Sequence, residues 1–236
     1  MTSTDEKGRC ELRPIAYIRT PYKDNFGVPR QSGMVRHTAS RVEFTPEFRD
    51  GAALRGLEEF SHVWLIWQFS EHVEQGWSPT VRPPRLGGNE RRGVFATRSP
   101  FRPNPLGLSC VRLLGRTEAG TLLVAGADLM DGTPIFDIKP YVPYADAHPE
   151  ALGGFAPEAP AALEVDCPAA LLEKLPQQKR AGLLGVLAQD PRPPYQNDPE
   201  RVYGFHFAGF HVCFTVADGL LRVVELEALS SDGTRC

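Results

Sequence analysis

The sequence lacks the cysteine pairs, the long apolar segment and the targeting signal on which several protein classes depend. It contains no Cys-x-x-Cys pair, so neither a disulfide framework nor a zinc knuckle is predicted from its five cysteines, at positions 10, 110, 167, 213 and 236. The polar segment 1–14 has no apolar region of the kind found in signal peptides, and the run 63-VWLIW-67 is too short to cross a bilayer. We therefore expect reduced thiols in a cytoplasmic protein without a membrane segment.

The common cofactor and catalytic fingerprints are also missing. Neither the Gly-x-Gly-x-x-Gly turn of dinucleotide-binding folds nor a Walker-type phosphate loop occurs, so any nucleotide-like ligand must bind to another architecture. There is no His-Glu-x-x-His, and His206 and His211 fall on an expected hairpin, so we predict no metal site. Ser61 and Ser109 lack a Gly-x-Ser-x-Gly elbow and are interpreted as turn and strand residues.

Glycine and proline are abundant instead, with 22 residues of each. This composition favours many short elements joined by turns over long helices. Apolar and alternating runs predict strands in 14–20, 41–45, 62–69, 107–117, 121–129 and 131–144, with short helical turns in 46–60. We interpret residues 10–148 as a mainly β unit, a single antiparallel β-barrel that is not a Rossmann fold.

The remaining chain predicts a second, smaller unit. An acidic segment rich in proline and alanine makes 149–167 a linker or covering loop. Leucines at helical spacing predict helices in 168–175 and 179–190, and three strands in 202–207, 210–216 and 220–229 form an antiparallel meander. Its turns are Ala208-Gly209 and Asp218-Gly219. We expect residues 168–236 to form an α+β domain.

Arginine is concentrated in 82-RPPRLGGNERRG-93 and 97-TRSPFRPNP-105, although the net charge of the chain is −3. Proline and glycine around these arginines restrain them for contact with phosphate or carboxylate groups, which suits RNA or a carboxylate-bearing ligand. A solvated loop is the simpler alternative. Asp128, Asp131 and Asp137 flank a Gly-Thr-Pro turn, and their spacing does not separate turn capping from ligand binding.

Several longer segments resemble the bacterial TsaA-like family, also called TrmO. They include 17-YIRTPYKDNFGVPRQSG-33, 60-FSHVWLIWQF-69, 77-WSPTVRPPRLGGNERRGVFATRSPFRPNPLGLS-109, 125-AGADLMDGTPIFDIKPYVPYA-145 and 189-QDPRPPY-195. The resemblance implies a homodimeric, S-adenosylmethionine-dependent tRNA methyltransferase that acts on N6 of threonylcarbamoyladenosine beside the anticodon. It also implies a β-barrel catalytic domain, a cofactor near the subunit interface, and a C-terminal domain that helps to hold tRNA.

The same resemblance implies where the site residues lie. Cofactor contacts are expected at Gln31, Ser32, Gly33, Ser70, Glu71, Arg98, Leu108, Gly126, Ala127, Asp128 and Leu129, with Arg98 and Asp128 also serving catalysis. The resemblance places Asp190, Arg192 and Tyr195 on the substrate surface of the C-terminal domain. The arginines of the restrained loops are expected to contact the substrate as well, namely Arg30, Arg82, Arg85, Arg91, Arg92 and Arg102, where Arg102 serves either its own loop or the RNA. The alternatives are a non-catalytic RNA-binding protein and a methyltransferase of another substrate.

Overall fold

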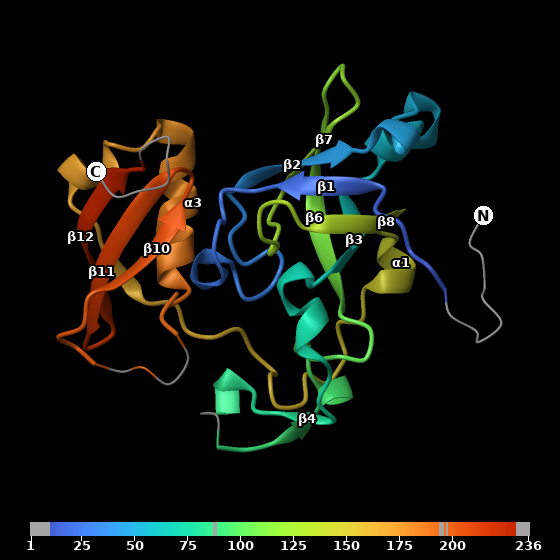
Figure 1. Ribbon diagram of the computed structural model, residues 1–236. Helices are drawn as coiled ribbons and strands as arrows, with labels where there is room; N and C mark the ends of the chain where they lie inside the picture. The colour runs from blue at the N-terminus through green and yellow to red at the C-terminus, as the bar shows by residue number, and fades with distance from the viewer. Residues whose placement is uncertain (1–9, 87–88, 194–195, 197, 230–236) are drawn as a thin grey trace.

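Six strands form a closed antiparallel ring in the N-terminal part of the chain (Figure 1). The computed structural model describes residues 10–86, 89–193, 196 and 198–229. Around the ring the order is β1-β2-β7-β6-β3-β8, and β8 pairs again with β1. The strands are β1 (Ala16–Arg19), β2 (Ala39–Phe44), β3 (His62–Gln68), β6 (Leu106–Arg116), β7 (Leu122–Ala125) and β8 (Pro134–Pro140).

The ring forms because its strands place apolar side chains on one face. In β3, alternate residues are buried, and Val63, Leu65 and Trp67 point into the core. They pack with Ile18, Val42, Val111, Leu122, Val124 and Ile135. Removing each large apolar side chain from water contributes about 1.5–3 kcal/mol, so this cluster is the main source of stability for the ring.

β7 is shorter than the sequence predicted. The expected strand continued to residue 129, but β7 ends at Ala125 because Gly126 adopts φ +81°. A left-handed backbone at this position turns the chain out of the sheet. Residues 126–129 therefore form a loop, and that loop becomes part of the site described below.

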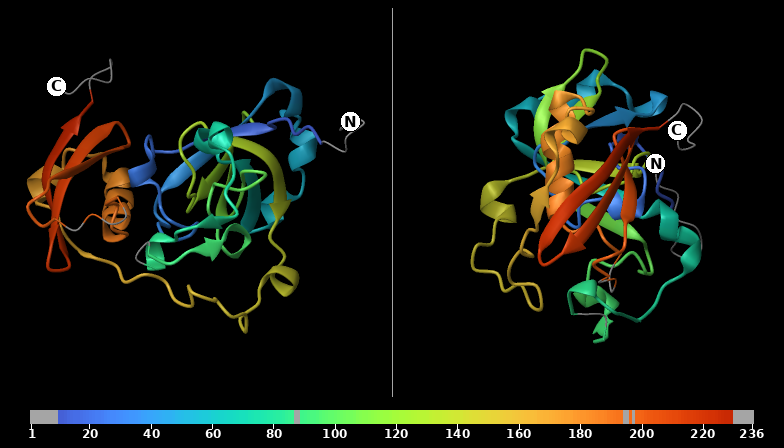
Figure 2. Two further views of the ribbon diagram at one scale, coloured as in Figure 1. Left: turned by 60° about the horizontal axis from the view of Figure 1, so that its bottom comes forward. Right: turned by 90° about the vertical axis from the view of Figure 1, so that its left-hand side faces the viewer.

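Short elements fill the connections. The predicted turns in 46–60 are confirmed as the 3-10 helices η2 (Pro46–Phe48), η3 (Gly51–Leu54) and η4 (Leu57–Glu59). The arginine-rich connection from β3 to β6 contains η5 (Ser70–Gln75), β4 (Thr80–Val81), η6 (Pro84–Leu86), β5 (Arg92–Gly93) and η7 (Val94–Ala96), with β4 paired to β5. Figure 2 shows this connection as a separate lobe beside the ring. The other two short helices are η1 (Asn25–Gly27) and α1 (Pro143–Asp146).

The C-terminal part is a mixed four-stranded sheet with two helices. The predicted meander is confirmed as β10 (Tyr203–Phe207), β11 (Phe210–Ala217) and β12 (Leu220–Ala228). Both predicted turns have two successive residues with positive φ, the geometry that two-residue hairpins need. The predicted helices are α2 (Ala169–Leu172) and α3 (Gln177–Ala188). Within the segment expected as a linker, β9 (Glu164–Asp166) forms a fourth strand, parallel to β12.

The segment between β1 and β2 holds the two parts together, and α3 lies on the side of the sheet that faces the ring (Figures 1 and 2). Tyr22 forms a β-bridge with Phe207 and joins the apolar core of the C-terminal part. A Cβ on Gly27 would come within 2.6 Å of the Phe205 ring, so this segment is in close contact with β10. No helix in the described residues is long and apolar enough to cross a membrane.

Candidate functional site

Two glycine loops meet at one end of the ring. The backbone N–H of Gly33 donates to the carbonyl oxygen of Gly126 over 2.8 Å. Both glycines have positive φ, +78° and +81°, and a Cβ on Gly126 would lie 3.3 Å from Gly33. The structure thus brings together 31–33 and 126–129, two segments that the resemblance assigned to the cofactor. Glycine is needed at 126 because both its backbone conformation and its close approach to Gly33 disfavour a side chain.

A hydrogen-bond chain runs from the core of the ring to Asp128. The indole Nε1–H of Trp67 donates to Ser109 Oγ over 2.9 Å, and Ser109 Oγ donates to Asp128 Oδ1 over 2.5 Å. Because an indole N–H can only donate, the Ser109 hydroxyl accepts from Trp67 and directs its own proton to the carboxylate. Ser109 is completely buried, so water does not compete for either bond.

Asp128 has a raised pKa. Burial is the main cause, and it outweighs the opposing effects of the Ser109 hydrogen bond, backbone N–H groups at Asp128 and Ser32, and the positive charge of Arg98. A carboxylate that loses solvation becomes a better proton acceptor and attracts a nearby cation more strongly. Sequence reasoning assigned Asp128 to the site through the resemblance, but it interpreted Ser109 as a simple strand residue and gave Trp67 no role.

Arg98 links the arginine-rich lobe to the first glycine loop. It follows η7, is exposed, and donates from Nη1 to Gln31 Oε1. Its charge also acts on Asp128. An exposed guanidinium therefore lies at the entrance of a site whose interior carries a buried carboxylate, an arrangement able to hold a ligand with both a cation and an anion.

A large cleft passes between the ring, the arginine-rich lobe and the interdomain segment. Among the expected cofactor residues, its walls include Gln31, Ser70, Glu71, Arg98, Leu108, Asp128 and Leu129. The other four, Ser32, Gly33, Gly126 and the buried Ala127, do not line the cleft but adjoin residues that do in the two glycine loops. Leu108 is 55% exposed and provides an apolar surface. Beside it, Gly107 leaves room for the Trp67 ring, since a Cβ there would lie 2.3 Å from the indole.

The arginines of the lobe have different environments. Arg82 lines the cleft, Arg91 donates to Thr80 Oγ1 over 2.8 Å, and Arg92 pairs with Glu90 at 2.7 Å. Arg102 donates to the carbonyl oxygens of Val94 (3.1 Å) and Thr97 (2.7 Å). These hydrogen bonds of Arg102 stabilise the loop that carries Arg98. Arg85 belongs to η6, but its side chain lies outside the described part of the structure.

A second polar cluster lies where the two parts of the chain meet. Arg192 donates to both carboxylate oxygens of Asp190, each at 2.8 Å, and Arg30 donates to the backbone carbonyl of Asp190 at 3.0 Å. Burial alone would raise the pKa of Asp190, but the hydrogen bonds and charge of Arg192 lower it. Asp190 is therefore held ionised with Arg192. Tyr195, also expected at this surface, lies outside the described residues.

The interdomain segment closes part of the cleft. Gly153 and residues 155–160 contribute to its lining. Phe155 lies under the Arg92 guanidinium, 6.0 Å from ring centroid to Cζ. The segment that the sequence predicted as a linker or covering loop thus covers the same cleft that Arg98 and Asp128 face.

Comparison with known proteins gives a consistent result along the chain. Residues 17–147 match the model of the tRNA-methyltransferase O N-terminal domain, and residues 160–229 match the TrmO C-terminal domain. The tRNA (adenine(37)-N6)-methyltransferase of Escherichia coli is 43% identical over 92% of this chain and 97% of its own length. The Eikenella corrodens protein of the same name is 47% identical over 72% of this chain and 98% of its own.

Solved structures agree with the sequence comparison. The crystal structure of TrmO from Pseudomonas aeruginosa superposes with a TM-score of 0.78 at 35% identity, covering 94% of this chain and all of that one. The order of the domains, the identity over nearly the full length and the fold agree, and this chain belongs to the TrmO family.

Proposed function

We propose that this protein is an S-adenosylmethionine-dependent methyltransferase that methylates N6 of the adenosine at position 37 of tRNA. Relatives that align over 92% and 72% of this chain are named for this reaction. The observation that carries the proposal is the meeting of the Gln31–Gly33 loop, the Gly126–Leu129 loop and Arg98 at one cleft. We further propose that the adenosine carries a threonylcarbamoyl group, as the family resemblance implies.

The residues of the cleft fit S-adenosylmethionine, which supplies an electrophilic methyl group on a positively charged sulfur. Because Gly33 and Gly126 have no side chains, backbone groups of the two loops can approach a ligand closely. Leu108 offers an apolar surface for a purine. Asp128 provides a buried carboxylate for a cation or for ligand hydroxyl groups. Arg98 and Gln31, joined by a hydrogen bond, are positioned to hold the carboxylate of the amino acid group.

Methyl transfer from a sulfonium is an in-line displacement, so the main task of the chain is to align donor and acceptor. Such alignment can contribute roughly 7–11 kcal/mol in the best cases. The acceptor nitrogen also carries a carbonyl, which makes its lone pair poor and its proton comparatively acidic. We propose that Asp128 receives that proton, because burial makes its carboxylate more basic and Ser109 orients it. A guanidinium has five N–H donors, so Arg98 can donate to the carbonyl or carboxylate of the acceptor as well as to the cofactor carboxylate.

The wider surface would hold the tRNA. Arg82 and Arg91 line the cleft, and Arg92 follows Arg91 in the arginine-rich lobe. We propose residues 10–148 as the β-barrel methyltransferase domain and 168–236 as a domain that assists substrate binding through Asp190, Arg192 and Tyr195. Arg30, from the N-terminal part, joins this surface through its hydrogen bond to the Asp190 carbonyl. Residues 149–163 link the two domains and line the cleft at 153 and 155–160, while β9 (Glu164–Asp166) belongs to the C-terminal sheet. We also propose a homodimer with the cofactor near the subunit interface.

The decisive experiment is nucleoside mass spectrometry of tRNA from cells that lack this protein. We expect loss of the methyl group from threonylcarbamoyladenosine and its return with the wild-type copy, but not with an Arg98→Ala copy. Calorimetry with S-adenosylmethionine separates the alternatives. A protein that binds RNA but no cofactor would be non-catalytic, and one that binds cofactor while the modified adenosine stays unchanged would act on another substrate.

A further inference from the structure

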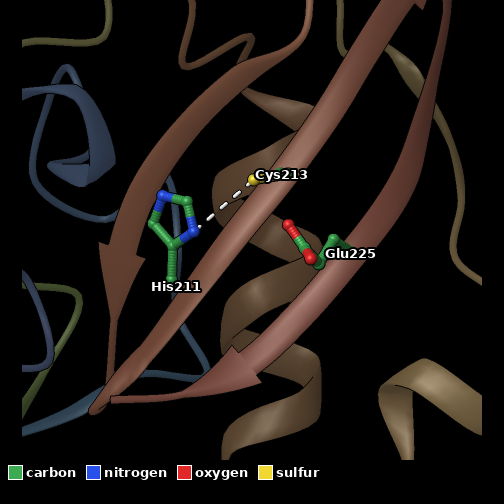
Figure 3. Close-up of side chains that lie close together, drawn as sticks. All are labelled: His211, Cys213 and Glu225. Carbon is green, nitrogen blue, oxygen red and sulfur yellow. Dashed lines mark hydrogen bonds between the residues drawn. The ribbon is translucent and has the colours of Figure 1, made fainter. Parts of the chain in front are cut away.

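The outer face of the C-terminal sheet carries a cluster of metal-binding side chains, away from the cleft. His211 and Cys213 come from β11 and Glu225 from β12, and Figure 3 shows all three on the side of the sheet opposite α3. One ligand atom of each lies within 4.8 Å of the others. This is the one such group found among the described residues.

Strand pairing builds this cluster. His211 and Cys213 are two residues apart in β11, so their side chains point to the same face. Cys213 is directly opposite Glu225 in the register of β11 and β12. Directly after this pair the register shifts, because Phe214 pairs with Val223 and leaves Val224 as an extra residue. The bulge keeps Val223 and Phe214 in the apolar core while Glu225 faces Cys213.

The imidazole of His211 is held in place by its neighbours. Its Nδ1 lies 3.5 Å from Cys213 Sγ. On the adjacent strand, a Cβ on Gly204 would come within 2.9 Å of His211 Nε2 and 3.7 Å of Cys213 Sγ. Glycine normally weakens a strand, so its presence opposite Cys213 indicates that the space above it is used. The ring occupies that space and presents Nδ1 to the thiol.

The distances suit a tetrahedral zinc ion. Zinc bonds of about 2.3 Å to sulfur and 2.1 Å to nitrogen place these two ligand atoms roughly 3.6 Å apart. His211 Nδ1 and Cys213 Sγ are 3.5 Å apart. Glu225 is exposed and can adjust its side chain to bring one oxygen to the same centre. His211 and Cys213 are only 9% and 7% exposed, so the ligand pair is largely shielded from bulk water.

We propose that His211, Cys213 and Glu225 bind a zinc ion that joins β11 to β12, with the fourth coordination position taken by water. Binding transfers the thiol proton of Cys213 to solvent, and the thiolate and carboxylate together balance the divalent charge. A mixed nitrogen, sulfur and oxygen set selects zinc over magnesium or calcium, which prefer oxygen ligands. No linear motif predicts such a site, because its ligands come from paired strands.

The test uses the purified full chain, freed of metal by chelator, and titrated with Co²⁺ as a spectroscopic probe. We expect one Co²⁺ per chain and a near-ultraviolet absorption from charge transfer between thiolate and cobalt, which an equal amount of Zn²⁺ removes. Cys213→Ser should abolish the absorption. Cys110→Ser, a cysteine in β6 outside the cluster, should leave it unchanged. Circular dichroism confirms that each variant is folded.

A second measurement does not depend on removing the cysteine. Glu225→Gln changes an exposed side chain and should keep the charge-transfer band while weakening Co²⁺ binding at least tenfold. Zn²⁺ should also slow alkylation of Cys213, mapped by peptide mass spectrometry, in the wild-type chain. The proposal is overturned if the wild type shows no thiolate absorption with Co²⁺, if Cys213→Ser retains it, or if Zn²⁺ leaves the alkylation rate of Cys213 unchanged.

Discussion

Ser109 donates a 2.5 Å hydrogen bond to Asp128 while it accepts one from the indole of Trp67. The ring core thereby determines the direction of a hydroxyl proton in the site, because the Trp67 N–H leaves Ser109 only the carboxylate as acceptor. A hydrogen bond of this kind stabilises the ionised form of Asp128 and opposes the effect of burial on its pKa. Ser109, which is buried and does not line the cleft, is thus one of the groups that set the pKa of Asp128.

Replacement of Ser109 by Ala should shift the pH dependence of methylation. Loss of this bond raises the pKa of Asp128 further, so the acidic limb of kcat/KM should move to higher pH. Hydrogen bonds to charged groups contribute about 1.5–3 kcal/mol, so on the acidic limb we expect a loss of roughly tenfold to a hundredfold that becomes smaller as pH rises. The measurement is methyl incorporation into tRNA across pH 5 to 9.

Trp67→Phe is the matched control for this prediction. It keeps an aromatic ring in the core but removes the N–H that orients Ser109, so the shift should have the same direction and a smaller size. An unchanged pH profile in Ser109→Ala would show that ionisation of Asp128 does not limit the reaction.

The raised pKa of Asp128 should make the folded protein less stable as pH rises. Its pKa in the folded state is raised, so between the ordinary pKa of an aspartate and that higher value the folded state holds more protons than the unfolded state. The free energy of unfolding therefore decreases with increasing pH in that window. In Asp128→Asn this contribution is absent, so the Tm of the variant relative to wild type should increase as pH is raised from 4 to 7. A difference in Tm that stays constant, or falls, would contradict the prediction.

Gly126→Ala should impair cofactor binding beyond its cost in stability. A left-handed backbone costs a residue other than glycine about 1–2 kcal/mol, and the added Cβ would also press against Gly33 at 3.3 Å. Gly120 is the matched control, because it has nearly the same φ, +83° against +81°, with nothing within 4 Å of its Cβ. Both variants should lower the Tm, Gly126→Ala more because of its contact with Gly33, but only Gly126→Ala should weaken S-adenosylmethionine binding in calorimetry. Equal affinities for S-adenosylmethionine in the two variants would show that Gly126 does not contribute to cofactor binding.

The sequence predicts features that a few adjacent residues determine, but not those that depend on contacts between distant residues. The hairpins at Ala208-Gly209 and Asp218-Gly219 were predicted correctly because two adjacent residues determine the turn. β9 was missed, since its three residues become a strand only through pairing with β12 at positions 220–222. The Ser109 to Asp128 bond joins residues 19 apart in sequence, and the Trp67 to Ser109 bond joins residues 42 apart. No local pattern encodes such pairs, and the family resemblance named Asp128 without its partners.

Gln31 should matter to catalysis mainly through Arg98. The guanidinium of Arg98 is exposed and donates to Gln31 Oε1, which restricts its orientation. We expect Arg98→Ala to abolish methylation, Arg98→Lys to retain little activity because lysine cannot form the same planar contacts, and Gln31→Ala to show an intermediate loss. Thermal unfolding should be almost unchanged in all three. Turnover at the wild-type rate in Arg98→Ala would show that Arg98 has no role in methylation.

Salt dependence should separate Arg102 from the arginines that contact RNA. Arg102 donates to Val94 and Thr97 carbonyl oxygens and lies over the Phe95 ring, 5.8 Å from its centroid, so its charge is used inside the loop. Arg102→Ala should lower methylation by disordering the loop that carries Arg98, yet leave the slope of log affinity for tRNA against log salt nearly unchanged. Arg82→Ala and Arg91→Ala should each reduce that slope by about 0.7–0.9, the value of one phosphate contact. A reduced slope in Arg102→Ala would mean that its guanidinium leaves the carbonyl oxygens when RNA binds.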